Sequence, residues 1–121
     1  MQPVSEVLAA VCAATGFDNI MISAISVTEL EHGIWRADTV ERTRYRCTYI
    51  DEVYAVIPVQ PFTKEIGQLA ARIDAEARKK GTVIPLADLQ IGTTALHFGF
   101  ALGTANTRHF QLIPNLIVKP L

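Results

Sequence analysis

The sequence predicts an α/β fold in which helices cover both faces of a parallel sheet. Short apolar segments alternate with amphipathic segments along the chain, which is typical of this class. Half of the residues are hydrophobic, and the mean hydropathy is +0.25. This composition indicates a sheet buried on both faces or a surface that a partner covers. The length of 121 residues predicts a single domain, residues 1–121.

Three helices and one strand are expected in the first half of the chain. Apolar residues recur at helical spacing over residues 3–15, and Gly16 is expected to end this helix. The β-rich segment NIMISAIS, residues 19–26, predicts a short strand, and Ser26 is expected to begin the second helix. A third helix is expected over residues 40–55. Its apolar side is expected to consist of Val40, Cys47, Ile50 and Tyr54.

Strands and helices are expected to alternate in the second half. The expected strands are residues 56–59, 82–84, 100–104 and 115–120, and the expected helices are residues 62–80 and 86–98. The first of these helices has the clearest apolar side in the chain. Pro85 forces a turn before the second, and Gly99 is expected to end it. The last strand is expected at a sheet edge, because a proline ends it.

Charge and cysteine usage narrow the classes of protein. The net charge of −1 gives no global basic field for nucleic acid, so such a contact would need a local patch. Cys12 and Cys47 are the only cysteines and form no metal-binding spacing, which predicts a reduced, intracellular compartment. No segment reaches about 18 apolar residues and no signal peptide is recognised, so a soluble, cytoplasmic protein without membrane contact is expected.

Three polar side chains are expected to meet at one edge of the sheet. Asn106 directly follows a predicted strand, Asp88 follows another by a few residues, and Glu29 follows the first. Parallel α/β folds bind ligands at the carboxyl ends of their strands. Carboxylate and amide oxygens suit Mg²⁺ or Mn²⁺, and such an ion can activate water and neutralise charge at a phosphodiester.

Each of these three residues also has a purely structural explanation. Ser26 and Glu29 match the S-x-x-E capping box, so Glu29 can simply complete a helix start. Asp88 lies in the first turn of its predicted helix, where a carboxylate offsets the helix dipole. Asn106 lies in TANTR, where asparagine often serves a turn. From spacing alone, these structural interpretations are favoured.

Other polar residues give weaker indications of function. The three histidines fit no zinc spacing, and His109 is expected in a loop. The glycines form no phosphate-binding loop, and no serine lies in a G-x-S-x-G motif. Four arginines crowd the second and third helices, where a solvated face is favoured over an RNA contact. They are Arg36, Arg42, Arg44 and Arg46.

Three segments taken together resemble PIN domains of the VapC toxin type. The first is ISAISVTELEHGIWRA, which resembles the second-acid segment, I-S-x-x-T-x-x-E-L-x-x-G. The second is PLADLQIGTTAL, which resembles the third segment, where an acid opens D-x-x-I-A-A-x-A-L. The third is FALGTANTRHFQLIPNLIV, which resembles the closing segment, L-x-T-x-[ND]-x-x-H-F followed by a short strand. The order is that of the family, and the match runs from Ile22 to the C-terminus.

The resemblance implies a three-layer α/β/α fold with a central parallel sheet. It also implies a Mg²⁺- or Mn²⁺-dependent endoribonuclease that cleaves RNA, is restrained by a VapB-type antitoxin and forms a homodimer. By motif, Glu29 and Asp88 would be catalytic, metal-binding carboxylates. Asn106 would take the fourth acidic position, directly or through water, and would remove one negative charge from the site. Thr104 would lie beside Asn106 in the same motif.

The sequence departs from the family before the first matched segment. The family opens with a strand that ends in an acid, whereas the 28 residues before Glu29 begin with an amphipathic helix. The first strand and its acid are therefore expected to be missing. Glu6 and Asp18 are the only acids in this stretch, and neither lies in the expected context. Because less ligand charge weakens Mg²⁺ binding, we hypothesise that activity is reduced or absent.

Three functions are left open by the sequence. The first is a metal-dependent ribonuclease of a toxin–antitoxin pair. The second is a truncated, non-catalytic PIN fold that keeps an antitoxin-binding or dimerisation surface, and the missing first acid separates it from the enzyme. The third is an unrelated flavodoxin-like domain that binds a small ligand. It ranks last, because the chain lacks a glycine-rich phosphate loop.

Overall fold

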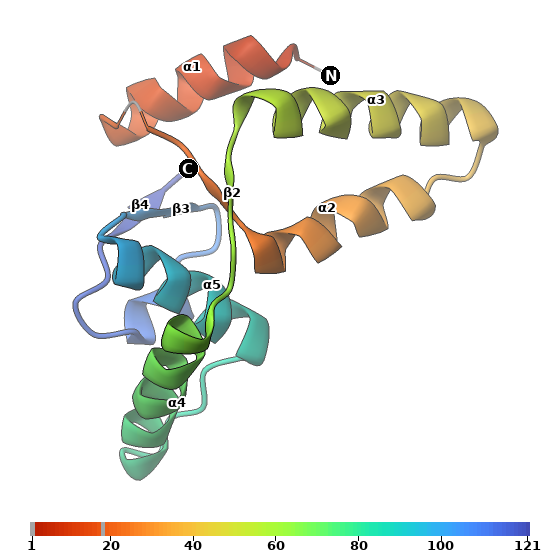
Figure 1. Ribbon diagram of the computed structural model, residues 1–121. Coiled ribbons are helices and arrows are strands. Elements are labelled where there is room, and N and C mark those ends of the chain that lie inside the picture. Colours follow the sequence, from red (N-terminus) through yellow and green to blue (C-terminus); the bar gives the residue numbers. More distant parts are fainter. Residues whose placement is uncertain (1, 18) are drawn as a thin grey trace. The chain divides into compact units, whose positions relative to one another are not determined.

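The computed structural model describes residues 2–17 and 19–121, so Asp18 lies outside the described residues. The chain forms two compact units, Met1–Gln60 and Pro61–Leu121, and each unit is described by itself. Figure 1 shows that helices make up most of both units and that the strands are short. No helix within the described part of the chain is long and apolar enough to cross a membrane.

The first unit contains three helices and one pair of parallel strands. Its elements are α1 (Val4–Thr15), β1 (Ile22–Ser23), α2 (Ala24–Trp35), α3 (Val40–Val56) and β2 (Val59–Gln60). Ile22 is opposite Val59 and Ser23 is opposite Gln60 in the pair. The described residues before β1 form α1 and contain no strand, as the sequence predicts. Gly16 ends α1 with a φ of 77°, a conformation that glycine adopts without steric cost.

The second helix begins two residues earlier than the sequence predicts. Ser23 has an extended backbone, and its hydroxyl accepts a hydrogen bond from the Ile25 amide at 3.2 Å. The cap of α2 is therefore Ser23, and Ser26 lies inside the helix. The predicted capping box of Ser26 and Glu29 is wrong, because a residue within a helix has already lost the extended backbone that a cap needs.

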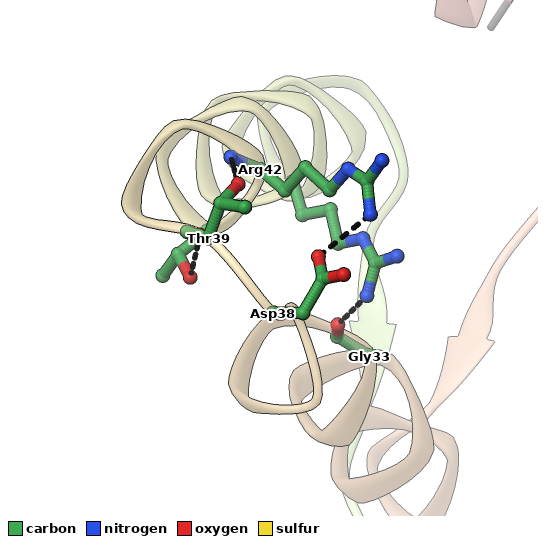
Figure 2. A network of polar contacts seen from close by, with 6 residues as sticks. Gly33, Asp38, Thr39 and Arg42 are labelled. Carbon is green, nitrogen blue, oxygen red and sulfur yellow. Dashed lines mark hydrogen bonds and ion pairs between the residues drawn. The ribbon is translucent and has the colours of Figure 1, made fainter.

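Helices α2 and α3 pack as a hairpin that polar contacts hold together. Thr39 caps α3 by accepting from the Arg42 amide at 3.0 Å, and Arg42 pairs with Asp38 at 2.6 Å; Figure 2 labels these residues. The Gly33 carbonyl, near the end of α2 and also labelled there, accepts from the Arg46 guanidinium at 2.6 Å. Donors at a helix C-terminus satisfy carbonyls that have no partner within the helix. The connection between the helices is thus fixed at both of its ends.

The predicted apolar side of α3 is half wrong. None of the residues of α3, all of which are described, is buried, and Val40 and Cys47 are exposed. Ile50 and Tyr54 are half-buried, and with Arg46 they lie at i, i+4 and i+8 on one side of the helix. The periodicity of apolar residues failed here because the contacts to α2 come from arginine and tyrosine side chains.

The second unit packs two helices around an apolar core. Its elements are α4 (Lys64–Lys79), α5 (Leu86–Phe98), β3 (Leu102–Thr104), the 3₁₀ helix η1 (Phe110–Leu112) and β4 (Val118–Pro120). Strands β3 and β4 pair in parallel, with Leu102 opposite Val118. The core consists of Ala70, Ile73, Ile84, Leu89 and Ile113. The helix over residues 86–98 and its end at Gly99 are confirmed.

Two of the predicted strands differ from the structure. Residues 82–84 form no strand, because the Ile84 side chain is buried in the core while the backbone there is irregular. Residues 56–59 are divided between the end of α3 and the start of β2. The α/β class with parallel strands is confirmed. In the described residues the strands form two separate pairs, one in each unit, instead of one continuous sheet.

A glycine in α5 allows the segment around η1 to approach the helix closely. A Cβ atom at Gly92 would overlap the Ile113 side chain and would lie 3.3 Å from Leu116 and 3.4 Å from Phe110. Phe110 and Ile113 are both buried against this position. Any larger residue would therefore have to push buried side chains away from α5.

We predict opposite effects of alanine at two helical glycines. Gly33→Ala in α2 meets no neighbouring atom, so it should raise the free energy of unfolding by about 0.5–1 kcal/mol through helix propensity. Gly92→Ala brings the same gain but overpacks a buried site, so it should lower that free energy by about 1 kcal/mol. Urea denaturation of the two variants checks this. Shifts of the same sign would contradict the packing at Gly92.

We also predict that the hydrogen bond between Tyr54 and Glu31 makes the free energy of unfolding depend on pH in the alkaline range. The Tyr54 hydroxyl donates to Glu31 at 2.9 Å. Burial raises the pKa of Tyr54 to about 12, and the nearby Glu31 and Asp51 add to the rise. The contribution of this hydrogen bond to the free energy of unfolding is present below the ordinary tyrosine pKa of 10.0. It is lost as the pH rises toward about 12.

The measurement compares the unaltered chain with Tyr54→Phe in urea denaturation at a series of pH values. Near neutral pH the unaltered chain should be more stable by about 1 kcal/mol. That difference should shrink above pH 10.0, where the unfolded tyrosine ionises first. A difference that stays constant into this range would show that the hydrogen bond does not form.

Candidate functional site

Asp88 lies in the first turn of α5 and is paired with a histidine from a distant segment. Its carboxylate oxygen Oδ2 is 2.7 Å from Nδ1 of His109. Both side chains are partly buried, with 27% of Asp88 and 33% of His109 exposed. An ionised carboxylate can only accept hydrogen bonds, so Nδ1 carries the proton and donates it. The predicted place of Asp88 in the first helical turn is confirmed.

The loop that carries His109 is ordered by its own hydrogen bonds. The Asn106 amide donates to the Thr104 hydroxyl at 3.1 Å, and this hydroxyl donates to the Asn106 carbonyl at 3.2 Å. The Arg108 amide donates to the side-chain oxygen of Asn106 at 3.4 Å. Asparagine often closes a turn in this way. The structural role predicted for Asn106 is therefore confirmed, and Thr104 directly contacts it.

The residues after this loop anchor it to α5. Phe110, next to His109, is buried with 7% of its surface exposed. The Leu112 amide donates to the His109 carbonyl at 3.2 Å, which closes the turn of η1. A bulky aromatic residue fixed in the core holds its neighbours with it. His109 is thus held between an ordered turn and a buried anchor.

Glu29 lies in the first unit, whereas Asp88, Thr104 and Asn106 lie in the second. Its side chain is exposed, in the middle of α2. Because the cap of this helix is Ser23, capping does not explain the carboxylate. Asn106 directly follows β3, as predicted, but Asp88 follows no strand. The expected meeting of Glu29 with the other residues stays a prediction.

The oxygen atoms of this site suit a hard divalent cation. Asp88 offers a partly exposed carboxylate, and Asn106 offers an exposed amide oxygen. Among residues 2–17 and 19–121, no group of three or more acidic, histidine or cysteine side chains is placed to hold a metal ion. Mg²⁺ does not need such a cage, because it keeps several waters and binds through one or two carboxylates. The donor chemistry therefore fits Mg²⁺ or Mn²⁺.

Sequence reasoning missed His109, which was expected only as a loop residue. The contact with Asp88 spans 21 positions, so no local spacing reveals it. The signal was nevertheless present, because His109 is the histidine of the closing motif L-x-T-x-[ND]-x-x-H-F. The fixed place of this histidine in the motif was the available sign that it lies near the candidate ligands in space.

Three arginines of the first unit make structural contacts. Arg42 pairs with Asp38 while both side chains stay more than half exposed. Arg46 binds the Gly33 carbonyl, and Arg36 is 3.4 Å from Nδ1 of His32. The solvated face predicted for Arg42 is confirmed. Cys12 and Cys47 are free.

Comparison with known proteins decides the family. No family model matches the chain. Ribonuclease VapC of Rickettsia bellii is 34% identical over 107 residues, which cover 88% of this chain and 79% of that protein. This chain belongs to the VapC ribonuclease family. The resemblance to PIN domains of the VapC type is thereby confirmed.

Two solved structures share the fold of this chain. The structure of VapBC2 from Rickettsia felis, bound to a DNA fragment from its promoter, has a TM-score of 0.80 at 24% identity. The matched region covers 98% of this chain and 86% of the chain in the solved structure. FitAcB from Neisseria gonorrhoeae has a TM-score of 0.82 at 22% identity, with the same coverage. The PIN-like α/β fold is therefore shown.

Proposed function

We propose that this chain is a ribonuclease toxin that hydrolyses RNA phosphodiester bonds with Mg²⁺ or Mn²⁺. Membership of the VapC ribonuclease family supports the reaction class. The observation that carries the proposal is the Asp88 carboxylate, which is partly buried and held by His109 at 2.7 Å. A helix start needs no such histidine for its dipole to be offset. The pair indicates a carboxylate held in one place for a ligand.

In this proposal Asp88, Glu29 and Asn106 hold the divalent cation. Asp88 and Glu29 provide the two negative charges, and Asn106 provides a neutral oxygen, directly or through water. Thr104 fixes Asn106 through the hydroxyl contacts at 3.1 and 3.2 Å. A bound cation supplies a water of lowered pKa and neutralises charge on the scissile phosphate. The protein side chains orient these partners.

We further propose that a VapB-type antitoxin restrains this toxin and that the chain forms a homodimer in the cytoplasm. A solved structure with the same fold, VapBC-5 from Mycobacterium tuberculosis, is named as a member of the VapBC family of toxin–antitoxin systems, which supports the antitoxin. Exposed apolar side chains on the chain are compatible with surfaces that partners cover, and Trp35 is 76% exposed. The RNA substrate is proposed from the name of the family.

A second candidate function is a non-catalytic binding module with the same fold. The observation that favours it is the low charge of the proposed site, whose only carboxylates are those of Asp88 and Glu29. The proposed site also has an amide at Asn106 where a fourth acid would add charge. RNA cleavage separates the two functions, because a binding module has no use for Asp88 as an ionised ligand.

Asp88→Asn is predicted to abolish both Mn²⁺ binding and RNA cleavage. The amide keeps the size of the side chain but removes its charge. Loss of a residue that supports a metal ligand lowers metal affinity or activity by up to about 100-fold, so loss of the ligand itself should lower them further. Asp74→Asn is the matched control, because Asp74 only pairs with Arg78 on the surface of α4. Calorimetric titration and a cleavage assay with added chelator measure the effects. Cleavage that survives both Asp88→Asn and the chelator would rule out the proposed reaction.

Asn106→Asp is predicted to strengthen Mn²⁺ binding. An aspartate can accept the same bond from the Arg108 amide, so the turn should persist. The added charge at about 4 Å contributes at least about 1 kcal/mol even in water, or roughly fivefold in affinity. Calorimetry of this variant beside the unaltered chain measures the change. Equal or weaker binding in a folded variant would exclude Asn106 from the cation site.

A further inference from the structure

We infer that His109 is the positioning residue that holds the Asp88 carboxylate in place for its cation. The inference rests on the proposed function and adds a residue to it. His109 is not proposed to contact the substrate or the reacting atoms. Its role is to fix one oxygen of Asp88, which leaves the other oxygen to the cation.

The hydrogen bond itself is the first support. It is short, at 2.7 Å, and joins two residues 21 positions apart, so it depends on the folding of the unit. Partial burial strengthens a charge-assisted bond, because water competes less for the two groups. An aspartate side chain otherwise has two rotatable bonds, and losing that freedom on metal binding costs free energy. His109 removes this freedom before the metal binds.

The packing of α5 explains why His109 reaches Asp88. Asp88 and Gly92 are four residues apart and lie on the same side of the helix. Gly92 is where Phe110 and Ile113 pack closely against α5. Because Phe110 follows His109 directly, this close approach places the imidazole one helical turn away, over Asp88. The ordered turn of Thr104 and Asn106 holds the other side of the loop.

The direction of the hydrogen bond determines the tautomer of the neutral imidazole of His109. Nδ1 must donate to Asp88, so a neutral His109 carries its proton on Nδ1 and leaves Nε2 unprotonated. In metal sites an outer-shell partner of this kind orients the ligand, and its loss costs about 10–100-fold in metal affinity. In many metal sites a histidine is the ligand and a carboxylate orients it. Here the carboxylate of Asp88 is the proposed ligand, and His109 orients it.

Two substitutions at one position test the inference. In His109→Asn the side-chain Nδ2 stands as many bonds from the backbone as Nδ1 of histidine, so a donor to Asp88 is kept. In His109→Leu the volume is kept and the donor is lost. Calorimetric titration of Mn²⁺ should show about 10–100-fold weaker binding for His109→Leu and a change within about threefold for His109→Asn. Thermal denaturation checks that both variants are folded.

Equal Mn²⁺ affinities of His109→Leu and the unaltered chain would overturn the inference while leaving the proposed function intact. If His109→Asn binds as weakly as His109→Leu, the donor is not what matters, and the inference fails as well. No Mn²⁺ binding by the unaltered chain would contradict the proposed function itself, and the role of His109 with it. The failures of the two proposals are therefore distinguishable.

Nitrogen NMR of the unaltered chain gives a readout that does not depend on a folded variant. Without metal, the ring of neutral His109 should show a protonated Nδ1 and an unprotonated Nε2. Titration with Mg²⁺ should shift the ring signals of His109, and Asp88→Asn should remove that shift. Protonation at Nε2 alone, or ring signals that Mg²⁺ leaves unchanged, would overturn the inference.

Discussion

The close packing of the η1 segment against α5 at Gly92 is the constraint on which the site of the second unit depends. Only a residue without a Cβ leaves room for Ile113, Leu116 and Phe110 at this point. That approach brings the loop after β3 to the first turn of α5, where His109 meets Asp88. The local polar contacts of Thr104 and Asn106 then fix the loop at low cost, because packing has already ordered its far end.

The elements that sequence predicted well are those that local chemistry determines. Glycines at positions 16 and 99 end α1 and α5 because both adopt positive φ. The helix over residues 86–98 follows from the turn that Pro85 forces before it and from its end at Gly99. The strand expected at residues 82–84 was wrong, because a short apolar segment looks the same whether its backbone pairs or only Ile84 is buried. The contacts between α2 and α3 were invisible to hydrophobic periodicity, because Arg46 and Tyr54 make them.

The candidate site was predictable as far as motifs reach. Asp88, Thr104 and Asn106 were named from sequence, and the structure places Asp88 in a helix start and joins Thr104 to Asn106. Structural and functional interpretations of these residues are compatible, since Asp88 offsets a helix dipole and is also held by His109. The contact of His109 with Asp88 was not predicted, although His109 belongs to the closing motif, because the contact forms only when a loop folds onto α5. The capping explanation of Glu29 no longer holds, because Ser23 is the cap of α2.

The central proposal is that Asp88 and Asn106 of the second unit hold a divalent cation. The most direct test is to add Mn²⁺ at low stoichiometry and map the loss of backbone NMR signals, because this paramagnetic ion broadens nuclei close to it. The account predicts that broadening in the second unit centres on residues 88 and 106–109 together and disappears when Mg²⁺ competes. Broadening confined to other acidic residues, or broadening near Asp88 that spares Asn106, would contradict this cation site.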